Sequence, residues 1–153
     1  YLRWFTEFGR GEIESLEASV EARPEARDAQ RALAGDITKR THGAEAAAAA
    51  IRDSEAMFSA APITDPEVLA SLHASTNGFT FPARTVASGS NALLTEAGVF
   101  ASKSEGRRLI SGGGVTINGV RLTDPDHVPE PIAGEWLEVR IGKRRREIGR
   151  QVG

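Results

Sequence analysis

The 153-residue chain is long enough for one medium-sized domain or two small ones, and its 40% hydrophobic and 26% charged residues are ordinary for a globular protein. It contains no cysteine, which excludes disulfide scaffolds and thiolate metal sites. The net charge of −2 hides an asymmetry, because residues 98–153 carry 10 basic and 7 acidic side chains whereas residues 1–61 carry 8 and 11. We therefore expect a polyanionic partner for the C-terminal third, and no membrane partner, since no apolar run could cross a bilayer.

Residues 1–60 have the pattern of about three helices. In the first, Ile13 and Val20 lie seven positions apart on one apolar face, opposite a face rich in glutamate. The second is expected over 24–42, with a proline at its first position and a glycine after its last turn. The third is an alanine-rich segment over 44–58.

Residues 61–89 differ in character from the segments on either side. Pro62, Pro66, Gly78 and Pro82 interrupt any long periodicity, and only a short helix near 66–73 is expected. We interpret this stretch as a linker between two domains that is partly ordered at best.

Residues 90–153 begin with two predicted helices joined by a tight turn. Asn91 can cap the first helix, and Ser102 followed by Glu105 matches the capping box that begins the second. The glycine run 112–114 ends that second helix.

Strand patterns follow these two helices. Asn118-Gly119 between two short alternating segments predicts a β-hairpin, and residues 136–141 alternate as a further strand. The fold class expected from these elements is α+β: an N-terminal helical segment, then a small domain made of a helix-turn-helix and an antiparallel sheet.

Basic residues gather in the helix after Ser102 and near the end of the chain. Lys103 and Arg107 lie one turn apart on the same helix face, where they could bind phosphates together. The alternative is a solvated basic face balanced by neighbouring glutamates. We expect one continuous cationic platform, extended by Arg140, whose RNA-contact residues are Lys103, Ser104, Arg107, Arg108, Arg121, Lys143, Arg144, Arg145 and Arg146.

No catalytic or metal-binding arrangement is recognisable. His42, His73 and His127 lie far apart in the sequence and have no second ligand at metal-binding spacing. We therefore expect no catalytic residue and no metal or other cofactor in this chain.

Two blocks of the sequence resemble a known family. Segments 101–110, 113–115 and 117–121 resemble the S4 RNA-binding domain. Segment 1–6, with matching positions up to Gly43, resembles the helical domain of bacterial-type tyrosyl-tRNA synthetases. The order of the two blocks makes the resemblance more specific than either block alone.

The resemblance implies three segments: a helical anticodon-binding-type domain over 1–60, a linker over 61–89 and an S4-like domain over 90–153. It implies binding of tRNA(Tyr), or another structured RNA, near the anticodon and the variable arm. The intact protein would be a class I tyrosine–tRNA ligase, a homodimer in the bacterial cytoplasm or, alternatively, the mitochondrial matrix. ATP and tyrosine would bind a catalytic domain that this chain lacks, so the chain itself would be non-catalytic.

Two alternatives remain open at this stage. Fungal mitochondrial relatives of this family help group I introns to splice, and no residue here separates that role from tRNA binding. A module that contacts another protein, with arginines serving only solubility, is the other alternative.

Overall fold

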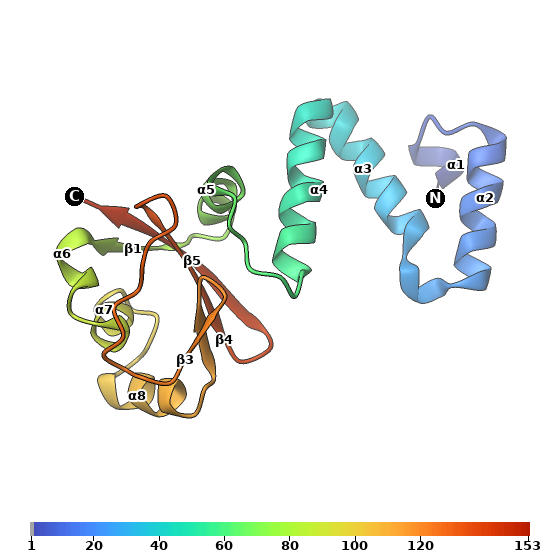
Figure 1. Ribbon diagram of the computed structural model, residues 1–153. Coiled ribbons are helices and arrows are strands. Elements are labelled where there is room, and N and C mark those ends of the chain that lie inside the picture. Colours follow the sequence, from blue (N-terminus) through green and yellow to red (C-terminus); the bar gives the residue numbers. More distant parts are fainter. Residues whose placement is uncertain (1) are drawn as a thin grey trace. The chain divides into compact units, whose positions relative to one another are not determined.

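The computed structural model describes residues 2–153 and divides the chain into two compact units (Figure 1). The helical unit ends at Ser54, and the sheet unit comprises Glu55–Gly153. Tyr1, which belongs to the segment that resembles tyrosyl-tRNA synthetases, lies outside the described residues. The α+β fold class expected from the sequence is confirmed.

The helical unit buries few side chains. Only Ile13 and Ala47 are buried among its described residues, because the apolar faces of its helices are narrow and rich in alanine. Its elements are α1 (Leu2–Phe5), α2 (Arg10–Ala22), a 3-10 turn (Pro24–Ala26), α3 (Asp28–His42) and α4 (Ala44–Phe58), whose last turn belongs to the sheet unit.

One helix of this unit begins later than the sequence predicted. Pro24 begins a 3-10 turn and not the long helix, which starts at Asp28. Arg27 separates the two with a left-handed backbone, at φ 55°. A residue in that conformation cannot continue an α-helix. Arginine rarely adopts it, so the break at Arg27 was not predictable from the residue type.

The sheet unit contains a five-stranded sheet in the order β1-β5-β4-β2-β3. Every pairing is antiparallel except that of β1 with β5, so the sheet is mixed. Its elements are α5 (Pro66–Ser75), β1 (Phe79–Pro82), α6 (Ala83–Val86), α7 (Ser90–Glu96), α8 (Lys103–Ser111), β2 (Val115–Ile117), β3 (Val120–Leu122), β4 (Trp136–Ile141) and β5 (Arg145–Val152).

Each face of the sheet has its own apolar cluster. On one face Leu137 and Val139 pack with buried side chains of α7 and α8. Because side chains alternate along a strand, Trp136 and Glu138 point to the opposite face. There Trp136 packs with Ile148 and with leucines of α5.

Residues 61–89 differ from the expected linker. They form α5, β1 and α6, and they bury Leu69, Leu72 and Phe81 in the two apolar clusters. The prolines that interrupt the periodicity stand at the edges of these elements: Pro66 is the first residue of α5, and Pro82 is the last of edge strand β1. The stretch is part of the sheet unit because α5 packs on the sheet and β1 is one of its strands.

Candidate nucleic-acid interface

Helix α8 presents a cationic face to solvent. Ser102 caps its first turn by accepting a hydrogen bond from the Glu105 backbone N–H at 3.2 Å, and the Glu105 carboxylate accepts one from the Ala101 N–H at 2.8 Å. The acidic side chain of the first turn is therefore engaged with the backbone, but its donor is the N–H of Ala101, whereas in a standard capping box the donor is the N–H of the cap residue, here Ser102. The cationic face of α8 holds a shallow hollow of about 380 Å³, which is lined by Lys103, Ser104, Arg107, Arg108 and Ser111.

The charged groups on this face have no partner in the protein. Lys103, Arg107 and Arg108 are exposed, and none of their charged side-chain groups forms an ion pair or hydrogen bond in the part of the chain that the structure describes. Three unpaired cations within two turns of one helix form a site suited to the phosphates of a polyanion.

Close packing against α7 holds α8 in place. A side chain at Gly106 would lie 2.1 Å from Asn91 Oδ1 and 2.4 Å from a ring carbon of Phe100, so only glycine allows this approach. The Asn91 amide also donates to the carbonyl of Lys103 at 3.1 Å. These contacts fix the basic helix on the sheet unit.

Two further predicted residues adjoin the end of α8. Arg121 on β3 is exposed, and its Nε donates to the carbonyl of Gly113 at 2.7 Å. At the β4–β5 turn, the N–H of Gly142 donates to the carbonyl of Gly114 at 2.8 Å. The glycine run after α8 therefore lies beside both Arg121 and the turn that carries Lys143.

The turn between β4 and β5 supplies three exposed cations. Lys143 and Arg144 have no hydrogen-bond or ion-pair partner among the residues described here. The guanidinium of Arg145 binds the Glu147 carboxylate at 2.5 Å. Its charge is partly neutralised, and Lys143 and Arg144 carry the unpaired charge of the turn.

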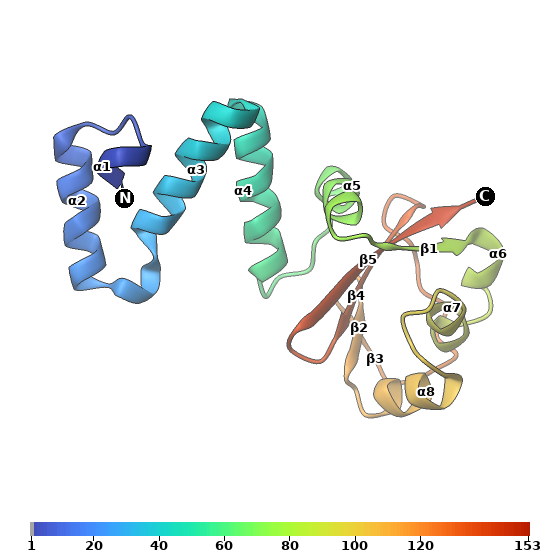
Figure 2. The same ribbon diagram turned by 180° about the vertical axis from the view of Figure 1, so that it is seen from behind.

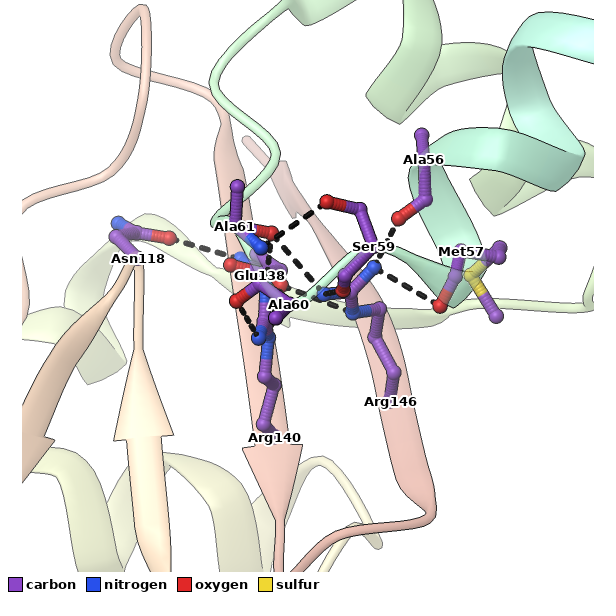
Figure 3. A network of polar contacts seen from close by, with 9 residues as sticks. All are labelled: Ala56, Met57, Ser59, Ala60, Ala61, Asn118, Glu138, Arg140 and Arg146. Carbon is purple, nitrogen blue, oxygen red and sulfur yellow. Dashed lines mark hydrogen bonds and ion pairs between the residues drawn. The ribbon is translucent and has the colours of Figure 1, made fainter.

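Arg146, predicted to contact RNA, has a guanidinium that is bound within the protein. Its side chain is only 7% exposed, and Nε lies 3.0 Å from the carboxylate of Glu138 (Figure 3). The guanidinium donates to backbone carbonyls at the end of α4 and just after it: Ala56, Met57 at 3.0 Å, Ser59 at 2.9 Å and Ala61 at 3.2 Å. It thus occupies the position of a cation at a helix C-terminus, where unpaired carbonyls favour positive charge.

Arg140 is bound in the same cluster and does not extend the platform. Its Nε lies 2.7 Å from Glu138 Oε1, and its guanidinium donates to the carbonyls of Ala60, at 2.7 Å, and Ala61. Glu138 is fully buried, and its single carboxylate pairs with both arginines, so the three groups together carry one net positive charge. We call Glu138, Arg140 and Arg146 the Glu138 cluster; it faces away from α7 and α8.

The pKa of Arg146 is lowered from its ordinary value, because burial outweighs the effect of Glu138. Burial lowers the pKa of its guanidinium from the ordinary value, the carboxylate of Glu138 raises it, and the charge of Arg140 lowers it. The Glu138 carboxylate therefore helps to keep this buried guanidinium charged.

The role of Glu138 was not predicted from the sequence. A signal was present, since strict alternation over 136–141 places Glu138 and Arg140 on the same face of a strand. What was missing is the pairing of β4 with β5, which sets Arg140 opposite Arg146.

Across residues 2–153, no group of three or more histidine, cysteine, aspartate or glutamate side chains could hold a metal ion. No helix among those same residues combines the length and the apolar character that a membrane span needs.

Comparison with known proteins agrees with the resemblance seen in the sequence. Residues 91–131 match the S4 domain family. The chain is 37% identical over 150 residues to a tyrosine–tRNA ligase of Mycobacterium tuberculosis (strain ATCC 25618 / H37Rv) and 39% identical over 152 residues to one of Streptomyces avermitilis. Each alignment covers 94% of this chain and 35% of the relative, so the chain spans about a third of the length of these proteins.

Proposed function

We propose that this chain, which carries an S4 domain and is similar to the C-terminal portion of tyrosine–tRNA ligases, binds tRNA(Tyr) through the cationic face of α8. The observation that carries the proposal is the set of unpaired cations on α8, inside the segment that matches the S4 family. Arg121 and the exposed residues Lys143, Arg144 and Arg145 extend the contact along the end of the sheet. Arg146 is left out because it is bound within the protein.

The proposed role in the whole protein is to hold tRNA while another domain attaches tyrosine. That domain, outside this chain, would bind ATP and tyrosine and form the homodimer. The similarity to bacterial tyrosine–tRNA ligases supports this assignment and a place in the cytoplasm.

The contact is expected to be electrostatic. Helix α8 exposes three cations, and no exposed aromatic pair on this helix could stack on bases. Binding would then be driven mainly by release of counterions from the RNA backbone, which makes affinity fall steeply with salt.

A titration of the chain with tRNA(Tyr) tests the proposal, with Kd measured between about 50 and 200 mM salt. Replacing Arg107 and Arg108 by glutamine is expected to weaken binding about tenfold and to reduce the slope of log Kd against log salt by about 1 to 2. Arg84→Gln is the matched control, because Arg84 is 77% exposed and its contact with Glu96 is long, at 3.8 Å.

Three outcomes distinguish the possible functions. Loss of affinity in the α8 variant with an unchanged control supports the proposal. No salt-dependent affinity for any RNA would contradict it and favour a protein-contact module. Equal affinity for tRNA(Tyr) and a group I intron RNA would favour the splicing role.

A further inference from the structure

A second polar cleft lies on the sheet unit, outside the segment that matches the S4 family. It has a volume of about 450 Å³ and separates the loop between α5 and β1 from the beginning of β5. Thr76, Asn77 and Gly78 form one wall, and Arg144 and Arg145 are on the other. None of these loop residues was a candidate in the sequence analysis.

The loop that forms the first wall is held against β5. Gly78 has no room for a side chain, because a Cβ there would lie 2.4 Å from the carbonyl oxygen of Ile148 and from a ring carbon of His73. The N–H of Gly78 donates to the carbonyl of His73 at 2.9 Å. The Thr76 hydroxyl donates to the carbonyl of Leu72 at 2.7 Å. These contacts give the cleft a defined wall.

Two side chains at the cleft keep their donors available. Asn77 is exposed with a left-handed backbone, at φ 52°, and its amide makes no hydrogen bond to any described residue. Arg144 is exposed and unpaired within the same part of the chain. The other charges at the cleft are engaged, since Arg145 pairs with Glu147 and Arg146 with Glu138.

These groups select the chemistry of the ligand. A free guanidinium and a free amide both donate hydrogen bonds, which matches the anionic oxygens of a phosphate. No aromatic side chain lines the cleft, so it offers no surface on which a base could stack. The turn that carries Arg144 is joined to the glycine run after α8 by the bond between Gly142 and Gly114. An RNA strand lying on α8 could therefore continue past this turn.

We infer that this cleft holds a backbone phosphate of the same RNA, with Arg144 and Asn77 as its donors. The inference rests on the proposed function and adds a contact formed by a segment, residues 76–78, that lies outside the S4 match. The cleft would enlarge the RNA footprint beyond α8 without reading sequence.

The first experiment compares variants of the full chain in tRNA(Tyr) titrations. Asn77→Gly combined with Arg144→Gln removes both donors, and glycine keeps the left-handed backbone that position 77 needs. We expect affinity to fall about tenfold and the salt slope to fall by about 1. The control is Arg84→Gln. Arg84 lies in α6, which follows Pro82, the residue of β1 that pairs with Val152. Val152 is about 23 Å along β5 from Arg145, so Arg84 is far from the cleft.

The outcomes separate this inference from the proposed function. If the Arg107/Arg108 variant loses affinity and the double cleft variant loses no more than Arg144→Gln alone, the cleft inference is overturned and the proposed function stands. If affinity falls in the cleft variant with no change of salt slope, the phosphate contact is likewise overturned. If the unmodified chain shows no salt-dependent RNA binding, the proposed function itself fails.

Crosslinking supplies a readout that does not depend on affinity. The chain has no cysteine, so Thr76→Cys can carry a single photoreactive label at the cleft. We expect a crosslink to tRNA(Tyr) from this position and none from the exposed control Ser88→Cys at the end of α6. Equal crosslinking at the two positions would overturn the inference.

Discussion

Replacing Arg146 by leucine is the sharpest test of the structural role assigned to this residue. The substitution removes the ion pair with Glu138 and every hydrogen bond from position 146 to the end of α4. It leaves a fully buried carboxylate whose Oε2 already has no partner in the described chain, compensated by Arg140 alone. Removing one member of a buried ion pair costs about 3 to 5 kcal/mol when the remaining charge is left uncompensated. Because Arg140 still pairs with Glu138, we expect a smaller loss in the free energy of unfolding, about 2 to 3 kcal/mol, from the lost charge-assisted hydrogen bonds.

Urea unfolding followed by circular dichroism and by the fluorescence of buried Trp136 measures this loss. Arg144→Leu, two positions earlier and exposed, is the matched control and should stay within about 0.5 kcal/mol of the unmodified chain. If Arg146→Leu is as stable as this control but binds RNA more weakly, the buried role is refuted and Arg146 returns to the interface.

Two further predictions concern packing in the sheet unit. Gly106→Ala should lower the free energy of unfolding by about 1 to 3 kcal/mol, measured in urea, because the added methyl group would overlap Asn91 and Phe100. Helix propensity alone would favour alanine by about 1 kcal/mol. A more stable variant would therefore contradict the close approach of α7 and α8. A fragment of residues 55–153 should give a dispersed NMR spectrum, whereas 90–153 should not, because it lacks α5 and β1; a dispersed spectrum from 90–153 would restore the boundary expected from the sequence.

Local features of the fold were predictable because their causes lie within a few residues. The cap formed by Ser102 and Glu105 is a case in which neighbouring side chains and backbone groups satisfy one another. The hairpin at Asn118-Gly119 is another, since both residues adopt the positive φ that such a turn requires, 50° and 82°. The exposed cations of α8 follow from the same local pattern.

Features that depend on distant segments were not predictable from the pattern. Arg146 stands in a run of four basic residues and looks like its neighbours, but in the structure it is bonded to carbonyls 85 to 90 positions earlier in the chain. The parallel pairing of β1 with β5 joins segments 70 positions apart, so it cannot be seen in either segment alone. The only pattern visible in residues 61–89 was the interruption of periodicity by proline and glycine. Side-chain charge alone therefore overstated the size of the cationic platform.

The central claim is that RNA lies on the cationic face of α8, and an NMR titration of the chain with tRNA(Tyr) tests it directly. The predicted result is that the largest changes in amide and arginine side-chain signals fall on Arg107 and Arg108, with further changes at Arg144, and that the side-chain signal of Arg146 stays in place. Changes confined to the helical unit, or a response of Arg146 with none on α8, would contradict the account.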